Sequence, residues 1–230
     1  MTNSTLILDV ETANDIHDAL VYDIGGHILE EDGTIHSEFS FVIRDIFCDE
    51  RDIMKSAYYA SKIPEYVEDL QNERRQMVNF MYAYRFINHL MKVYNCKTVA
   101  AYNCSFDRNA LNVTLRYLTK SEYRWFFPYD TEFICIWNMA CNSICQDGNY
   151  RTFTETYRHY SNHGKNYRAT AEIVYAYLTN NPDYQEEHKG LDDVKIETEI
   201  YLACLAAGCE KMGIKRNCWQ KVKRGAIALR

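Results

Sequence analysis

The chain has 230 residues, of which 47% are hydrophobic and 25% charged, so it can fold as one or at most two globular domains. No apolar run approaches the roughly 18 residues that a membrane-spanning helix needs, and residues 1–5 show no secretory signal, so no membrane partner is expected. The net charge of −6 argues against capture of nucleic acid by the whole surface, and nine scattered cysteines fit reduced thiols, which favours a cytoplasmic location.

The first predicted element is a strand within residues 4–12, which reads Ser-Thr-Leu-Ile-Leu-Asp-Val-Glu-Thr. This aliphatic run is typical of a buried central strand in an α/β sheet. Asp9 and Glu11 are two residues apart, so both carboxylates face the same side of the strand. Such a pair is costly without a cation between the two charges, and oxygen ligands suit Mg²⁺ or Mn²⁺. A strand end that enters solvent is the alternative interpretation.

The next segment predicts a hairpin and a long helix. Residues 20–29 and 35–43 have the apolar pattern of strands, and Asp32-Gly33 between them is a strong hairpin signal. Residues 45–67 have no regular pattern. From 67 to 94, apolar side chains recur every three or four residues, which predicts one helix.

The second half alternates between strand and helix patterns, with an irregular polar and aromatic segment at 146–166. In chain order the expected elements are a strand at 98–102, a helix through 110–118, a strand at 125–127, and helices through 134–140, 168–179 and 190–211. Five strands interspersed with helices, without an internal repeat or linker, predict a single α/β domain.

A second group of candidate site residues follows the fourth strand, in the run Tyr102-Asn103-Cys104-Ser105-Phe106-Asp107. The run opens a helix, so Asp107 is expected near the end of the first strand. Ligands bind at the carboxyl ends of strands in open α/β sheets. Taken alone, Asp107 is better explained as a helix cap.

A third group lies at residues 186–194, where His188 stands in a polar connection and Asp193 in the first turn of the last helix. An exposed histidine and helix-start acids that favour the helix dipole are the alternative interpretation. The three groups occur in order, each at a predicted junction between elements, and this arrangement favours a shared site.

In these three motifs the chain resembles the DEDDh 3′→5′ exonucleases, a ribonuclease H-like family that includes the proofreading epsilon subunit of bacterial DNA polymerase and ribonuclease T. The family motif Asp-x-Glu-Thr matches residues 9–12, and His-Asn-x-x-Phe-Asp matches residues 102–107 with Tyr102 in place of His. A His followed after four residues by Asp matches His188 and Asp193, and this spacing selects Asp193 over Asp192. The resemblance spans about residues 5–207 and implies a mixed five-stranded sheet flanked by helices.

The resemblance implies hydrolysis of phosphodiester bonds from the 3′ end of single-stranded DNA or RNA, with release of nucleoside monophosphates. Asp9, Glu11, Asp107 and Asp193 would hold two divalent cations, Mg²⁺ or Mn²⁺, about 3.5–4 Å apart. His188 titrates near neutrality and would accept the proton of the attacking water.

The resemblance also implies a binding site for the terminal nucleotide. The backbone around Thr12 and Ala13 would bind this nucleotide, with Asn103 close by. Related enzymes include dimers, so a homodimer or a polymerase partner is compatible with the family.

The last residues differ in charge from the rest of the chain. Residues 211–230 hold seven Lys and Arg side chains and no acidic one. We therefore expect an exonuclease domain at 1–210 and a basic C-terminal tail at 211–230 that can hold a phosphate backbone. A solvated helix end with a loose terminus is the alternative.

Two other kinds of site were weighed. A non-catalytic module on a nuclease fold could bind a 3′ end or a protein partner, but the set of five catalytic side chains is complete, which argues against it. A zinc site could use clustered Cys and His residues, but the paired Cys-x-x-Cys spacing of a structural site is absent from the sequence. The residues of that cluster are Cys135, Cys141, Cys145, His159 and His163.

Overall fold

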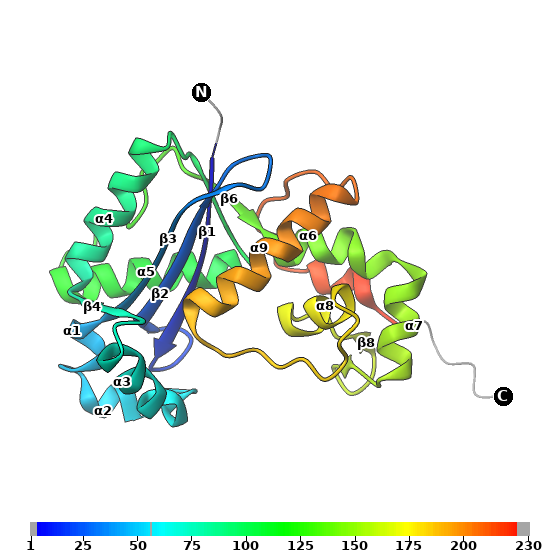
Figure 1. The fold of residues 1–230 in the computed structure, drawn as a ribbon, viewed down its shortest axis with the longest axis horizontal. Coiled ribbons are helices and arrows are strands. Elements are labelled where there is room, and N and C mark those ends of the chain that lie inside the picture. The colour runs from blue at the N-terminus through cyan, green and yellow to red at the C-terminus, as the bar shows by residue number, and fades with distance from the viewer. Residues whose placement is uncertain (1–3, 56, 225–230) are drawn as a thin grey trace.

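The structure, a computed structural model, describes residues 4–55 and 57–224. Its centre is a mixed sheet of six strands in the order β4-β3-β2-β1-β5-β6, with helices on both faces (Figure 1). The strands are β1 (Thr5–Ala13), β2 (Leu20–Leu29), β3 (Ile35–Ile43), β4 (Gln76–Val78), β5 (Thr98–Ala101) and β6 (Glu132–Cys135). β1 pairs antiparallel with β2 and parallel with β5, so it occupies the middle of the sheet.

The helices divide between two cores, one on each face of the sheet (Figure 1). The α-helices are α1 (Arg44–Phe47), α2 (Arg51–Lys55), α3 (Ile63–Gln71), α4 (Phe80–Val93), α5 (Cys104–Thr119), α6 (Ile136–Asn142), α7 (Gly148–Thr156), α8 (Ala171–Leu178) and α9 (Gly190–Ala206). Short 3-10 helices η1 (Ala60–Lys62), η2 (Ile144–Gln146) and η3 (Cys218–Val222) and a small sheet of β7 (Tyr160–Ser161) and β8 (Asn166–Tyr167) complete the chain. Among the described residues, no helix is both long and apolar enough to cross a membrane.

Alternation along β1 decides which side chains face which core. Leu6, Leu8 and Val10 pack in the core under α4 and α5, while Ile7 packs in the core that contains α6, α8 and α9. Successive side chains of a strand point to opposite faces. Asp9 and Glu11 therefore continue the face of Ile7, towards α9.

The single helix expected over 67–94 is wrong. The structure has α3, the sixth strand β4, and α4 in its place. β4 pairs in parallel with residues 41–43 of β3, and Glu73 adopts a left-handed backbone with φ of 57° just before it. Asn79 then caps α4 by accepting a hydrogen bond from the backbone N–H of Tyr82 at 2.8 Å. Strand pairing and a new helix cap thus outweigh the continuous helical spacing.

The strand expected at 125–127 is also wrong, because the corresponding strand is β6 at 132–135. Phe126 and Phe127 are buried in the core as single side chains, and the N–H of Phe126 donates to the side chain of Asn112 at 2.8 Å. Ile134, expected in the next helix, belongs to β6. Two of the three aromatic side chains in this run are therefore buried without strand pairing, whereas Trp125 is exposed.

Several boundaries differ from the prediction in smaller ways. The segment at 45–67 contains short helices, the segment at 146–166 contains α7, and the last helix ends at Ala206. Of the expected basic tail, residues 211–224 lie against the domain: Gly213 forms a bridge with Ile134, and Lys223 with Asn166. The remaining tail residues, 225–230, lie outside the described part of the chain.

Candidate active site

A cavity of about 600 Å³ opens at the end of β1, beside α9. It is lined by six of the eight side chains that sequence reasoning selected, namely Asp9, Glu11, Asn103, Asp107, His188 and Asp193. Thr12 and Ala13 follow a register shift in the pairing of β1 with β2 and are not among the described residues that line the cavity.

The start of α9 separates two neighbouring acids. Asp193 lines the cavity, whereas Asp192 accepts an ion pair from Arg75, with 3.2 Å between Nη2 and Oδ2. Residues adjacent on a helix cannot share one face. The geometry therefore places Asp193, and not Asp192, beside the acids of β1.

The four carboxyl groups in the cavity that the sequence predicted as metal ligands have raised pKa values, and burial is the largest cause at each one. Burial, followed by the charge of Asp193, raises the pKa of Glu11 to about 9. Burial, followed by the charge of Glu186, raises the pKa of Asp193 to about 8, and burial raises the pKa of Asp107 to about 7. The pKa of Asp9 is raised well above its usual value by burial and by surrounding acids. Packing like charges out of water is unfavourable unless a cation is present.

The donor set fits divalent cations. Two buried carboxylate oxygens, Oδ2 of Asp9 and Oδ1 of Asp193, have no hydrogen-bond partner in the structure. Ligand atoms of Glu11, His188 and Asp193 all lie within 4.8 Å of one another. Oxygen-rich sites of this kind bind Mg²⁺ and Mn²⁺. These features support the metal binding inferred from the sequence.

Two acids of the cavity were not selected from the sequence. Glu197, one helical turn after Asp193, is buried and accepts a hydrogen bond from the N–H of Tyr102 at 3.1 Å. Burial, followed by the charge of Asp107, raises its pKa well above the usual value. Burial, followed by the charge of Glu172, raises the pKa of Glu186 to about 7. The spacing of four between residues 193 and 197 was the available signal for Glu197.

His188 has an unusual backbone and a close aromatic neighbour. Its φ is 51°, a left-handed conformation that is uncommon outside glycine. Its ring stacks on Tyr59, with 4.1 Å between ring centroids and 13° between planes. Burial lowers the pKa of His188, which favours a neutral imidazole that can accept a proton. Tyr59 lies in the segment without pattern, so no sequence signal pointed to it.

Aromatic side chains and one arginine also line the cavity, and together they are called the aromatic wall. They come from separate parts of the chain: Tyr102, Phe106, Trp137, Tyr167, Arg168 and Trp219. Trp219 belongs to η3, within the segment expected as a basic tail. The last described residues therefore contribute to the same cavity as the acids.

The six-stranded mixed sheet with its flanking helices confirms the predicted α/β fold class, and the fold is similar to that of Exonuclease I. Solved structures similar to the chain include E. coli Exonuclease I in complex with a dA16 oligonucleotide, with a TM-score of 0.51 and 14% identity over 90% of this chain and 41% of that chain. The E. coli Exonuclease I complex with a 5cy-dA13 oligonucleotide gives a TM-score of 0.53 and 14% identity over 90% and 41%. An ExoI/SSB-Ct complex gives 0.51 and 12% over 87% and 40%.

The chain thus spans about two fifths of the length of these solved chains. At such low identity the likeness shows the fold. No family model matches the sequence, and no curated protein matches it.

The raised carboxyl pKa values predict that the metal-free protein loses stability as the pH rises. In the folded state Asp107, Asp193 and Glu11 keep their protons up to about pH 7, 8 and 9, whereas in the unfolded chain they lose them near pH 4. The folded state therefore binds more protons between these limits, so the free energy of unfolding falls with pH. Thermal unfolding in EDTA should show a lower midpoint at pH 8.5 than at pH 5.5, and Mn²⁺ should raise the midpoint at pH 8.5. A midpoint in EDTA that rises over this range would show that these carboxyl groups are not held in their protonated form by the folded state.

Proposed function

We propose that the chain is a metal-dependent 3′→5′ exonuclease that hydrolyses phosphodiester bonds at the 3′ end of single-stranded nucleic acid and releases nucleoside monophosphates. The observation that carries the proposal is the convergence of Asp9, Glu11, Asp107, His188 and Asp193 on one cavity. The likeness in fold to Exonuclease I, which was solved with single oligonucleotides such as dA16, also supports it.

Asp9, Glu11, Asp107 and Asp193 are the residues that would hold two divalent cations, Mg²⁺ or Mn²⁺. When bound, such cations polarise the phosphate and stabilise the charge on the leaving oxygen. The two carboxylate oxygens without hydrogen-bond partners, on Asp9 and Asp193, are the acceptors most in need of a cation. Four ionised acids are tolerated at this depth only with positive charge between them.

His188 is assigned as the general base. Its Nδ1 lies 3.9 Å from Oε2 of Glu186, which is too far for a hydrogen bond, so Glu186 is a neighbouring acid, and a ring nitrogen of His188 takes the proton of the attacking water. The lowered pKa keeps this nitrogen unprotonated at neutral pH. Stacking on Tyr59 fixes the plane of the ring.

We assign the aromatic wall to stacking against the bases of the bound single-stranded nucleic acid. Stacking on aromatic rings tolerates any sequence, and it contributes about 1–3 kcal/mol per base. Trp137, Tyr167 and Trp219 are available for this role in the cavity. Asn103 and the backbone around Thr12 and Ala13 are assigned to the terminal nucleotide, as the motif predicts.

The direction of cleavage tests the proposal. A 5′-labelled single-stranded oligonucleotide incubated with Mn²⁺ should shorten to a ladder, because the enzyme removes one nucleotide at a time from the 3′ end. A matched oligonucleotide with a blocked 3′-hydroxyl should be degraded much more slowly. Cleavage of a closed circular single strand, or binding of the oligonucleotide without any hydrolysis, would contradict the proposal, and the second result would indicate a non-catalytic module.

A further inference from the structure

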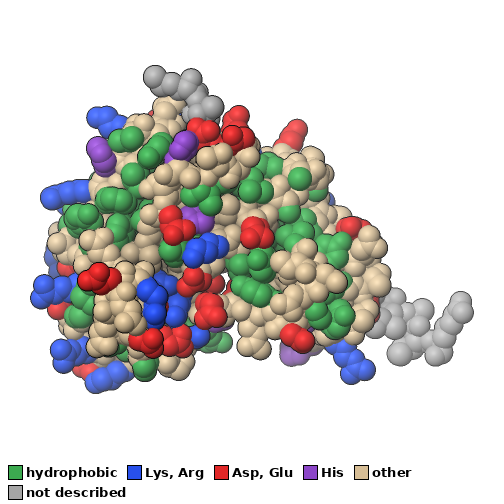
Figure 2. Space-filling model, viewed as in Figure 1, with side chains coloured by type: hydrophobic (Ala, Val, Ile, Leu, Met, Phe, Trp, Pro, Cys, Tyr) green, Lys and Arg blue, Asp and Glu red, His purple; other side chains and the backbone are tan. Residues whose placement is uncertain are grey.

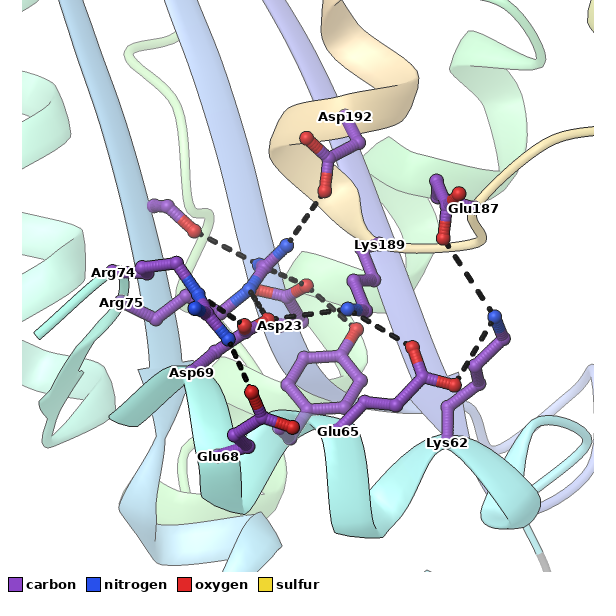
Figure 3. Close-up of polar contacts among 12 residues, drawn as sticks. Asp23, Lys62, Glu65, Glu68, Asp69, Arg74, Arg75, Glu187, Lys189 and Asp192 are labelled. Atoms are coloured by element: carbon purple, nitrogen blue, oxygen red, sulfur yellow. Dashed lines mark hydrogen bonds and ion pairs between the residues drawn. The ribbon is translucent and has the colours of Figure 1, made fainter. Parts of the chain in front are cut away.

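A network of buried charges joins β2, α3 and Lys189, the residue that follows His188 (Figure 3). Its central members are Asp23 on β2, Asp69 on α3, Arg75 just before β4, and Lys189, the residue immediately before α9. All four are buried, and none of them lines the cavity of the candidate active site. On the face drawn in Figure 2, basic side chains lie among acidic ones where α3 approaches the start of α9. Ion pairing on this scale, away from the acids of the cavity, requires its own explanation.

Asp23 is fully buried and fixes the first turn of α9. Its carboxylate accepts from Nη1 of Arg75 at 2.9 and 3.1 Å, from the hydroxyl of Tyr66 at 2.8 Å and from the backbone N–H of Gly190 at 3.0 Å. The first N–H groups of a helix lack partners within the helix, and Lys189 provides no side-chain cap. The carboxylate from β2 therefore takes the place of a local cap and complements the helix dipole.

Lys189 is held from the opposite side by α3. Its Nζ lies 3.0 Å from Oε2 of Glu65 and 3.2 Å from Oδ2 of Asp69. Figure 3 shows the lysine pointing from the start of α9 towards both carboxylates. Residues 189 and 190 are thus fixed by α3 and β2 together.

Lys189, which is held by these ion pairs, directly follows His188, whose backbone is strained. A left-handed backbone at a residue other than glycine persists only where the surrounding structure enforces it. His188 has this backbone, Lys189 next to it is bound by two carboxylates, and the ring of His188 stacks on Tyr59. Tyr59 precedes the turn that leads into α3, so the same part of the chain holds the ring of residue 188 and the side chain of residue 189.

The backbone of Gly190, at the start of α9, lies in close contact with the backbone of Gly25 on β2, and this contact restricts movement of α9 along β2. A Cβ added to Gly190 would lie 2.7 Å from the backbone nitrogen of Gly25, and a Cβ on Gly25 would overlap the backbone of Gly190. α9 therefore begins in direct contact with β2. Neither element can shift along the other without breaking the bond from Gly190 to Asp23.

On the basis of the proposed function, we propose that Lys189 is a positioning residue for His188. Its ion pairs to Glu65 and Asp69 hold the strained backbone of His188, so that the imidazole stays beside Glu11 and Asp193 in the cavity. The side chain of Lys189 does not line the cavity that holds the candidate catalytic residues. It acts through the geometry of the preceding residue.

The test compares three single variants by steady-state kinetics on a 5′-labelled single-stranded oligonucleotide. Lys189→Met keeps the aliphatic stem and removes both ion pairs, so kcat should fall by about 10- to 100-fold, the order of loss caused by a 1 Å misplacement. KM should stay within about twofold of the parent, since the aromatic wall is untouched. Lys189→Arg should restore most of kcat. Arg74→Gln is the matched control, because Arg74 pairs with Asp69 and Glu68 and not with α9.

A second measurement does not depend on activity. Hydrogen exchange of the peptide covering residues 184–193 should be faster in Lys189→Met than in the parent and in Arg74→Gln, while exchange of β1 and β5 stays unchanged. Glu65→Gln should show a smaller change in the same direction, and combining it with Lys189→Met should add little, because both remove one interaction.

The possible results separate the two proposals. A Lys189→Met variant with unchanged kcat in an active protein, or a loss shared equally by Arg74→Gln, would overturn the positioning role. A parent without nuclease activity would overturn the proposed function. In that case unchanged exchange at 184–193 in Lys189→Met would also overturn the anchoring of this segment.

Discussion

Asp9→Asn is expected to abolish hydrolysis and, at the same time, to make the metal-free protein more stable. Asp9 carries a buried oxygen without a hydrogen-bond partner, and its pKa is raised by burial and by the charges of Glu197 and Asp107. Removing the charge relieves that repulsion but removes a metal ligand, which contributes several kcal/mol to the transition state. The rate should fall by more than about 10³-fold, since each 1.36 kcal/mol is a factor of ten. Turnover of labelled oligonucleotide with Mn²⁺, and thermal unfolding in EDTA at pH 8, measure the two effects.

Asp192→Asn is the matched control for this prediction. Asp192 neighbours Asp193 in sequence, yet its side chain pairs with Arg75 and does not line the cavity. Its loss should leave most of the activity and should not stabilise the metal-free protein. If Asp192→Asn were inactive and Asp193→Asn active, the assignment of the acid on α9 would be wrong. An Asp9→Asn protein that is less stable than the parent in EDTA would show that the carboxylates do not repel one another as the structure indicates.

Asp9 is expected to be needed for hydrolysis and yet to lower the stability of the metal-free protein. This conflict between function and stability explains why the acids of β1 could be recognised from the sequence. Asp9 and Glu11 interrupt an aliphatic strand at positions that continue the face of Ile7, where apolar side chains would pack better. A protein retains such residues at a cost in stability where they serve a function. Local pattern breaks of this kind are visible in a single sequence, and the structure places Asp107, His188 and Asp193 around the same cavity.

Other parts of the site left a weaker trace in the sequence, or none. Tyr59 stacks on His188 from a segment without periodicity, and Glu197 looks like an ordinary acid in a mostly apolar helix. Their roles depend on which segments meet in space, which the pairing of the sheet decides. β4 was missed for a similar reason: three residues next to helical spacing became a strand only because β3 offered an open edge. Phe126 is a further example, since a strand was predicted there and the hydrogen bond of its N–H to the side chain of Asn112 was not.

The buried network around Asp23 was equally invisible in the sequence. Its members lie at 23, 69, 75 and 189, far apart along the chain, and each is a charged residue of a type usually found at the surface. Charged residues are rarely buried unless they are paired, and the pairing appears only in three dimensions. The consequence for the site is that β2 and α3, which contribute no ligand, determine where α9 begins.

His188→Gln is expected to lower kcat by about 10²- to 10⁴-fold, the usual contribution of a general base. Glutamine keeps a polar side chain of similar reach but cannot take up a proton at neutral pH. KM for the oligonucleotide should change little, because the aromatic wall remains. The parent should gain activity with rising pH as His188 loses its proton, at a pH below the usual pKa of 6.5 because burial lowers that value. The variant should lack this rise.

The position of His188 leaves one competing role, and a binding measurement distinguishes it from general-base catalysis. Ligand atoms of His188, Glu11 and Asp193 lie within 4.8 Å of one another, a spacing that a single cation could also occupy. A residue that only accepts a proton should not alter metal stoichiometry. Calorimetric titration with Mn²⁺ should therefore give the same number of bound ions and nearly the same affinity for the parent and for His188→Gln. Loss of one bound Mn²⁺ in the variant would make His188 a metal ligand. The proton of the attacking water would then need another acceptor, and Glu186, whose Oε2 lies 3.9 Å from Nδ1 of His188, is a candidate.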